Sequence, residues 1–177
     1  MARADYIPEE SFEILLKALM PQNRLALQVA LATGLRIDDV LHIKTAQLEK
    51  DRFTLKEMKT GKGRRVRIPK ALREECLRYA GRFYAFEHRL DPKKPRTRQA
   101  VYKDLKRACE LFRVNGLQIS PHTARKIYSV GLYDKYLSVD KVRDKMGHKY
   151  NSTTEIYCTA DMRTAKATKR RKVKFPK

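Results

Sequence analysis

The sequence predicts a mainly α-helical domain with one small antiparallel β-sheet, an α+β fold. Apolar residues recur at helical spacing in most of the segments that lie between Pro and Gly residues. Two short segments instead alternate apolar and polar residues around a glycine-containing turn, which is the pattern of a β-hairpin. With 177 residues, 42% of them hydrophobic, the chain can bury one core, so we expect a single domain.

Three helices are predicted before residue 45. Acidic residues at 9–10, directly after a proline, favour a helix start, and this first helix should end near residues 20–21. A second helix is almost wholly apolar over 25–31 and breaks at 33–34, where a glycine stands. A short third helix should begin at about Asp38.

A β-hairpin should follow these helices. Residues 52–59 alternate in the manner of a strand, with Glu57 in the same series as the apolar side chains. Residues 60–63 are typical of a turn, and 66–68 resume the alternation. The tip of this hairpin is basic.

The rest of the chain is predicted to be helical. Pro69 opens a helix that runs to about Phe86, and the basic, proline-bearing residues 91–98 form a loop. Further helices are expected at about 99–114, 122–135, 138–146 and 153–161. Residues 163–177 hold eight Lys or Arg and no acidic residue, which favours a disordered or nucleic-acid-binding tail over a packed element.

The charge of the chain indicates a polyanionic partner. There are 41 Lys and Arg residues against 20 Asp and Glu, a formal net charge of +21. Such an excess is hard to keep compact without a polyanion, and nucleic acid is the partner that it predicts. A membrane surface is the competing interpretation, but the chain has no long apolar span and no amphipathic helix with a continuous basic face.

The cysteines and the N-terminus favour a reducing cell interior. Cys76, Cys109 and Cys158 are odd in number and widely separated, so neither a zinc site nor a disulfide framework is implied. Residues 1–6 lack the apolar stretch of a secretion signal. We therefore expect a cytoplasmic protein that lies beside DNA in the nucleoid.

Six residues supply the groups that a phosphodiester exchange with a tyrosine nucleophile requires. They are Arg36, Lys59, His122, Arg125, His148 and Tyr157. Two guanidiniums can grip one phosphate and neutralise the charge that develops on its oxygens, while imidazoles add hydrogen bonds and move protons. The tyrosine can become a covalent carrier, and a lysine can protonate a leaving oxygen or remain a solvated hairpin charge.

The spacing of these residues strengthens the interpretation. Arg36 follows the break after a buried helix, so a rigid scaffold would hold it. His122 and Arg125 are three residues apart and share one face of a helix that starts after a proline. His148 stands nine residues before Tyr157 across a turn. Taken singly, each residue is as typical of surface, capping or packing roles, and only the combination indicates catalysis.

The motifs that contain these residues resemble those of the tyrosine recombinases, the phage-integrase family. Residues 32–36, Ala-Thr-Gly-Leu-Arg, resemble the family's first arginine motif, and 59–62, Lys-Thr-Gly-Lys, its hairpin lysine. Residues 120–125, Ser-Pro-His-Thr-Ala-Arg, are similar to its histidine and second arginine. Met-Gly-His at 146–148 and Ser-Thr-Thr-Glu-Ile-Tyr at 152–157 complete the series in order, and the likeness spans about residues 7–162.

The resemblance implies a DNA breaking-rejoining catalytic domain over residues 1–162 and a basic tail over 163–177. Tyr157 would attack a backbone phosphate to leave a 3′-phosphotyrosyl link and a free 5′-hydroxyl, and a second strand's hydroxyl would reverse the step. Arg36, Arg125 and His148 would hold the transition state, Lys59 would protonate the leaving oxygen and His122 would assist proton transfer at the tyrosine. Because the bond energy is conserved, no metal, ATP or other cofactor is expected.

The implied partner is double-stranded DNA with specific recombination sites, bound by a homotetramer of a chain that is monomeric alone. Two groups of basic residues are expected to contact phosphates, together with the tail. They are Lys62, Arg64, Arg65 and Arg67 of the hairpin, and Lys93, Lys94, Arg96 and Arg98 of the later loop. In the family the segment after the nucleophile often docks on a neighbouring subunit, so residues 162–177 are equally a candidate for that contact.

Two departures from the family pattern limit the resemblance. Asp39 stands where the family usually places a glutamate, and we expect this shorter carboxylate still to orient Arg36. Only six residues precede the catalytic region, whereas recombinases normally carry an amino-terminal DNA-binding domain. The chain is therefore expected to be either a short recombinase, like the family's small DNA invertases, or a fragment of a longer integrase.

Two other functions remain open on the sequence. A type IB topoisomerase would use the same chemistry to relax DNA, although the shortness of the chain and the Thr-Thr-Glu-Ile-Tyr motif favour a recombinase. A catalytically idle DNA-binding module that regulates a longer recombinase is the alternative from another class. The DNA site and the direction of the reaction, whether integration, excision or inversion, are not encoded in any motif that we recognise.

Overall fold

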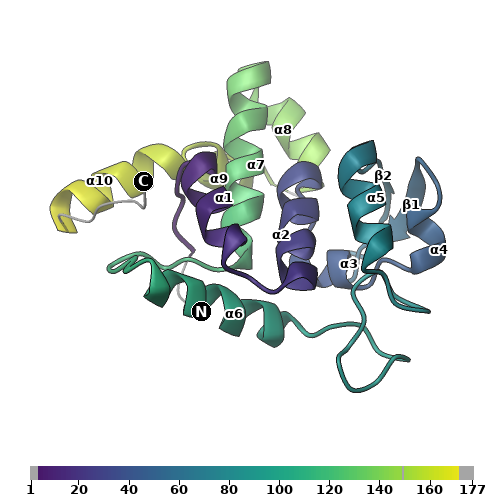
Figure 1. Ribbon diagram of the computed structural model, residues 1–177. Coiled ribbons are helices and arrows are strands. Elements are labelled where there is room, and N and C mark those ends of the chain that lie inside the picture. The colour runs from purple at the N-terminus through teal and green to yellow at the C-terminus, as the bar shows by residue number, and fades with distance from the viewer. Residues whose placement is uncertain (1–3, 149, 172–177) are drawn as a thin grey trace. The chain divides into compact units, whose positions relative to one another are not determined.

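The computed structural model describes residues 4–148 and 150–171, and it is mostly helical with one two-stranded antiparallel sheet (Figure 1). This confirms the predicted fold class. The chain divides into two compact units, one of Leu19–Asp104 and the other of Met1–Ala18 with Leu105–Lys177. The predicted domain boundary at residue 162 stays a prediction, and we describe each unit by itself.

The unit Leu19–Asp104 is built around a buried helix and a β-hairpin. Its elements are α2 (Pro21–Thr33), α3 (Ile37–Leu41), α4 (Thr45–Leu48), β1 (Phe53–Lys56), β2 (Gly63–Val66), α5 (Lys70–Arg78) and the first part of α6 (Arg98–Leu111). Proline at the first position starts α2, since its missing N–H has no helical partner there. Gly34, with φ of 65°, ends the helix in the left-handed conformation, where its N–H donates to the Ala30 carbonyl at 2.8 Å.

The hairpin places one face of β1 in the core. Phe53 pairs with Val66 and Leu55 pairs with Arg64 in an antiparallel register. Side chains two residues apart on a strand point the same way, and Phe53 and Leu55 are buried on the inner face. Glu57 continues this series just after the strand and is buried too, at 3% exposure.

Helix α5 is shorter than predicted. It ends at Arg78, whereas the expected helix ran to about Phe86. The following backbone instead pairs with the segment after α3, since the Ala85 N–H donates to Ile43 and the Thr45 N–H donates to Phe83. Hydrogen bonds between distant segments therefore override the local helical pattern after Arg78. The single-turn helix α4 was also not predicted.

The second unit is a helical cluster. It holds α1 (Glu9–Lys17), the end of α6, α7 (Pro121–Tyr136), α8 (Val139–Met146), α9 (Asn151–Cys158) and α10 (Ala160–Arg171). Ser120 caps α7 and Ser138 caps α8, each through a side-chain oxygen that accepts a backbone N–H. Helices α7, α8 and α9 pack on one another, around a buried cluster of Val142, Met146 and Cys158.

The C-terminal segment differs from the expectation. One helix was predicted over 153–161, but the chain forms α9 and α10 with Thr159 between them. Helix α10 continues to Arg171 and packs on α7 and α9, so the first part of the predicted tail is an ordered helix. Thr164 is buried, and its hydroxyl accepts the Tyr6 N–H at 3.0 Å. Residues 172–177 of the predicted tail lie outside the described residues.

Candidate active site

Arg36 is held at the junction of α2 and α3. After Gly34 ends α2, the backbone extends at Arg36, which is the N-cap residue of α3. The side chain is 18% exposed, and its Nη1 donates to Glu57 Oε2 at 2.9 Å. Asp39, the carboxylate expected to orient Arg36, lies farther away, with Oδ2 at 3.9 Å from Nη1.

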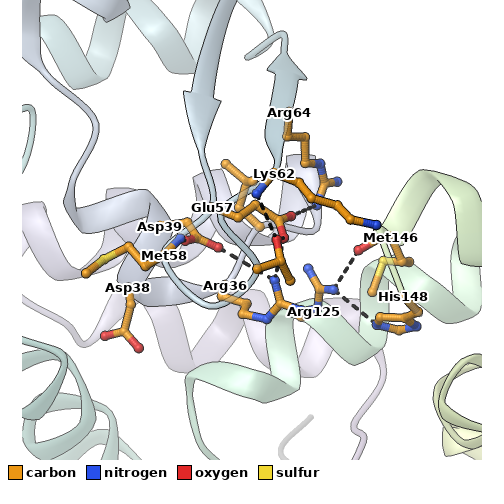
Figure 2. A network of polar contacts seen from close by, with 12 residues as sticks. Arg36, Asp38, Asp39, Glu57, Met58, Lys62, Arg64, Arg125, Met146 and His148 are labelled. Atoms are coloured by element: carbon orange, nitrogen blue, oxygen red, sulfur yellow. Dashed lines mark hydrogen bonds and ion pairs between the residues drawn. The ribbon is translucent and has the colours of Figure 1, made fainter. Parts of the chain in front are cut away.

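Glu57 is a residue of this site that the sequence interpretation did not assign. Its Oε2 also accepts the Thr60 hydroxyl at 2.8 Å, and its Oε1 lies 3.5 Å from Arg64 Nη1 (Figure 2). Burial alone would raise the pKa of Glu57, but the hydrogen bond from Thr60 and the charges of Arg36 and Arg64 outweigh it. The pKa of Glu57 is therefore lowered, and the carboxylate is ionised at neutral pH.

Asp39 anchors the hairpin. Its Oδ1 accepts the Met58 N–H at 2.8 Å, so it fixes the backbone one residue before Lys59. Lys59 itself is exposed, beside the turn that Gly61 makes with φ of 68°. Lys59 thus lies in the hairpin turn, three residues after the end of β1, next to a backbone position that Asp39 anchors, and its side chain remains exposed.

Arg125 is the second arginine, and it is almost wholly buried. It lies in the first turns of α7 and is 2% exposed. Its Nη2 donates to the carbonyl of Met146 at 2.8 Å and to His148 Nε2 at 3.1 Å (Figure 2). The Met146 carbonyl is one of those left unpaired where Gly147 ends α8, so a guanidinium is well placed to satisfy it.

The partners of His148 fix its tautomer. A guanidinium has no acceptor, so Nε2 must accept from Arg125, and a neutral His148 carries its proton on Nδ1. That Nδ1 lies 3.0 Å from Thr154 Oγ1, which therefore accepts. Thr154 is fully buried, and its own hydroxyl donates to the Tyr150 carbonyl at 3.4 Å. Thr154 is a second residue that the sequence interpretation quoted in a motif without giving it a role.

Tyr157 lies beside His148. Their ring centroids are 5.1 Å apart at an interplanar angle of 56°. Tyr157 belongs to α9, and its ring is half-buried against the cluster of Val142, Met146 and Cys158. The side chain of His122 is exposed in the first turn of α7, and the backbone N–H of this residue donates to Ser120 Oγ at 3.3 Å.

The predicted residues therefore fall into two local sets. Arg125 of α7, His148 of the segment after α8 and Tyr157 of α9 come together in one unit, with His122 at the start of α7. Arg36 and Lys59 belong to the other unit, where Glu57 and Asp39 tie the turn and the hairpin together.

The residues expected to contact DNA differ in exposure. Lys62, Arg65, Arg67, Lys93, Lys94 and Arg98 are exposed, although Lys94 pairs with Asp91 and Arg98 with Asp38. Arg64 is partly buried between Glu57 and the Thr33 carbonyl, to which its Nη2 donates at 2.8 Å.

Arg96 does not have the surface position expected of a phosphate contact. It is 7% exposed, and its guanidinium donates to Asn23 and Gln22. Burial lowers its pKa, although nearby Asp104 acts in the opposite direction. Arg96 therefore holds the loop after α5 against the start of α2.

Two other expectations concern the cysteines and membranes. Cys76, Cys109 and Cys158 are free and buried. Over the ranges 4–148 and 150–171, no helix has the length and apolar character that crossing a membrane requires.

Comparison with known proteins identifies relatives among recombinases. The chain is 27% identical over 144 residues to a tyrosine recombinase XerA of Pyrococcus furiosus, covering 77% of this chain and 49% of that protein. It is 33% identical over 139 residues to a tyrosine recombinase XerD-like protein of Streptococcus gordonii, covering 78% and 55%. The chain thus spans about half the length of these curated relatives.

Solved structures show the same fold. A lambda integrase dimer bound to a COC′ core site has a TM-score of 0.72 at 18% identity, covering 89% of this chain and 49% of that one. The catalytic domain of bacteriophage HP1 integrase has a TM-score of 0.63 at 17% identity and covers 89% of each chain. The sequence also matches the Phage integrase family over residues 5–164. Since that match extends over most of the sequence, this chain belongs to the phage integrase family.

Proposed function

We propose that this chain acts as a site-specific DNA recombinase that cleaves and rejoins DNA through a 3′-phosphotyrosyl intermediate. The arrangement of Arg125 on α7, His148 just after α8 and Tyr157 on α9 is the observation that carries the proposal. A phosphate ligand, a proton-bearing imidazole and a nucleophile lie within one local cluster, in a chain that belongs to the phage integrase family.

The proposed reaction exchanges one phosphodiester for another. The Tyr157 oxygen forms a bond to a backbone phosphorus, the bond from that phosphorus to the 5′-oxygen breaks, and Lys59 supplies a proton to the leaving oxygen. The phenol loses its proton, and His122 assists that transfer. A 5′-hydroxyl from another strand then attacks the phosphotyrosine and releases Tyr157, so no net energy source is needed.

Arg36, Arg125 and His148 are assigned to the phosphate oxygens, and His148 serves there with a second proton, on Nε2, because the Nε2 of its neutral form has no N–H to donate. Negative charge builds on those oxygens as the phosphorus becomes five-coordinate, and guanidiniums stabilise that charge without reorganising when they are held in advance. Both arginines are held: Arg36 by Glu57, and Arg125 by the Met146 carbonyl. For the proposed reaction, both local sets must act on the same phosphate when DNA is bound.

The proposed partner is duplex DNA that carries specific recombination sites. The net charge of +21 and the exposed Lys62, Arg65 and Arg67 of the hairpin support phosphate binding. One solved relative by fold is a lambda integrase tetramer bound to a Holliday junction. By analogy we propose a homotetramer on DNA, acting in the cytoplasmic compartment that holds the DNA.

A covalent-trapping experiment tests the proposal. The protein is incubated with a library of nicked duplexes carrying randomised sequence next to the nick, so that cleavage releases a short strand and prevents religation. Adducts that survive denaturant are recovered and sequenced. We expect adducts with the wild type and with Tyr133→Phe, a control tyrosine that packs on the same cluster. We expect none with Tyr157→Phe.

The outcomes separate the possible functions. If no duplex in the library yields an adduct although the protein binds DNA, the chain is a binding module and the proposed chemistry is wrong. If adducts form at arbitrary sequences and supercoiled plasmid is relaxed, the activity is that of a topoisomerase. Adducts confined to a short consensus, with strand exchange between two such sites, support the recombinase.

A further inference from the structure

We propose that Glu57 is a positioning residue that holds Arg36 in the orientation needed to bind the scissile phosphate. The inference rests on the proposed function, because it takes Arg36 as a phosphate ligand. It goes beyond that function by assigning the support of Arg36 to a carboxylate on the hairpin rather than to Asp39. Figure 2 shows Glu57 between the side chains of Arg36 and Arg64.

The contacts of Glu57 hold its carboxylate in place. One oxygen accepts from Arg36 at 2.9 Å and from the Thr60 hydroxyl at 2.8 Å, and the other faces Arg64 at 3.5 Å. The Glu57 N–H donates to the Lys62 carbonyl at 2.9 Å, so the backbone that carries this side chain is also held. A side chain that is 3% exposed with this many partners has one available orientation.

Burial explains why the Glu57 carboxylate pairs with two arginines. A carboxylate removed from water is costly unless charged donors surround it, and Arg36 and Arg64 are those donors. Asp39 is also buried, but Oδ1 is occupied by the Met58 N–H, and Oδ2 is 3.9 Å from Arg36. The short, well-directed contact to Arg36 therefore comes from Glu57.

The same contact leaves Arg36 able to bind a phosphate. A guanidinium carries five N–H donors, and Glu57 engages one nitrogen, Nη1. The arginine keeps 18% of its side-chain surface exposed, whereas the side chain of Glu57 is only 3% exposed. A ligand that approaches from solvent thus meets the guanidinium and not the carboxylate. Glu57 can therefore position Arg36 without competing with a phosphate for it.

Glu57 also links Arg36 to the lysine of the hairpin. It lies two residues before Lys59, and Asp39 of α3 holds Met58 between them. Arg64 of β2 extends the link, because its Nη2 donates to the Thr33 carbonyl at the end of α2. Three contacts therefore join the segment from α2 to α3 that carries Arg36 to the hairpin that carries Lys59.

The principal test measures the rate of adduct formation on a nicked duplex selected in the trapping experiment. Glu57→Gln keeps the size of the side chain but removes its charge. We expect it to lower the rate at saturating DNA by about 10- to 100-fold while the Kd for DNA changes less than about threefold. Glu75→Gln is the matched control, because it removes the carboxylate from another Arg–Glu pair of the same unit, Arg24–Glu75 at 2.8 Å.

A double-mutant cycle tests whether the effect passes through Arg36. In an Arg36→Lys background, Glu57→Gln should cost less than about threefold, since the contact it supports is already lost. Thr60→Val is a milder variant at an exposed position, and it should slow cleavage in the same direction by a smaller factor. A folded Glu57→Gln protein that cleaves within about twofold of wild type, or one whose defect is the same in both backgrounds, would overturn the inference.

A second measurement does not depend on activity. The Nη1–H signals of Arg36 in a low-temperature NMR spectrum of the DNA-free protein report how firmly Glu57 holds that nitrogen of the guanidinium. We expect slow solvent exchange in the wild type and in Glu75→Gln, and fast exchange in Glu57→Gln. If the wild type forms no adduct, the proposed function fails, and these signals alone decide whether Glu57 holds Arg36: an unchanged exchange rate in Glu57→Gln would reject the positioning role.

Discussion

Tyr157 and Cys158 are neighbours in sequence, yet only the tyrosine is placed to act as a nucleophile. Cys158 is 4% exposed within the apolar cluster, and burial raises the pKa of its thiol. A thiol must ionise to attack, so burial makes Cys158 a poor nucleophile. Tyr157 lies on the same helix but is half-buried beside His148.

The first prediction concerns this pair. Cys158→Ser should retain adduct formation within about threefold of wild type, after correction for the fraction folded, because the thiol takes no part in the exchange. The measurement is the yield of denaturant-stable adduct on the selected duplex. Loss of the adduct in a folded Cys158→Ser protein, with the adduct kept in Tyr157→Phe, would assign the nucleophile to the cysteine.

The second prediction concerns the tautomer of His148. Thr154→Val keeps the shape of the buried side chain but removes the acceptor of the Nδ1 proton, whereas Thr154→Ser keeps it. We expect Thr154→Val to slow cleavage by about 10- to 100-fold and Thr154→Ser by much less. Nitrogen chemical shifts of His148 should report an Nδ1–H imidazole in the wild type. An Nε2–H form there would contradict the assignment.

At the scale of elements, the β1–β2 hairpin shows where a sequence pattern was informative and where it was not. The alternation at 52–59 predicted the strand, and Glu57 fell in the inward-facing series. A charged residue at a buried position was the signal for its role, but the arginine partners lie 21 and 7 residues away. Such pairings follow from the tertiary fold and from no local spacing.

The third prediction uses the lowered pKa of Glu57. A carboxylate whose pKa is lower in the folded than in the unfolded chain stabilises the fold above its unfolded pKa, and that stability is lost as pH falls through the folded pKa. The free energy of unfolding of the wild type should therefore approach that of Glu57→Gln as pH falls from about 5 to about 3. Urea titrations at several pH values measure it, and a constant difference would contradict the charge pairing.

The fourth prediction concerns two arginines that were both predicted from the sequence to contact DNA. Arg65 is exposed on the hairpin, whereas Arg96 is buried. Arg65→Ala should reduce the slope of log K for DNA against log salt by about 0.9 with little change in stability. Arg96→Ala should lower the free energy of unfolding by about 1–3 kcal/mol and leave the slope unchanged. The reverse pattern would return Arg96 to the DNA-contacting set.

At the scale of the whole molecule, most of the architecture could be predicted from the sequence. Helical periodicity and the Pro and Gly residues at 8, 21, 34, 121 and 147 located the main helix ends, since these residues act locally on the backbone. The early end of α5 and the helical structure of α10 were not predicted, and the two errors have a common reason. Backbone pairing with residues 43–45 ends one, and packing on α7 and α9 orders the other.

The motif order predicted the identities of the site residues better than their surroundings. Arg125, His148 and Tyr157 could be chosen because each lies in a short motif, and the structure brings them into one cluster. Thr154 and Glu57 act on other side chains rather than on a ligand, so their roles became visible only in three dimensions. The whole chain's charge of +21 is the remaining global signal, and it indicates a polyanion without naming its sequence.

The central claim is that the chain joins itself to DNA through Tyr157, and mapping the covalent link tests it most directly. An adduct trapped on a nicked duplex is digested with protease and nuclease, and the modified peptide is identified by mass spectrometry. We predict a nucleotide attached through its 3′-phosphate to Tyr157, and loss of the adduct in Arg125→Ala as well as in Tyr157→Phe. A link to any other residue, or strand cleavage that leaves no protein on the DNA, would contradict the account.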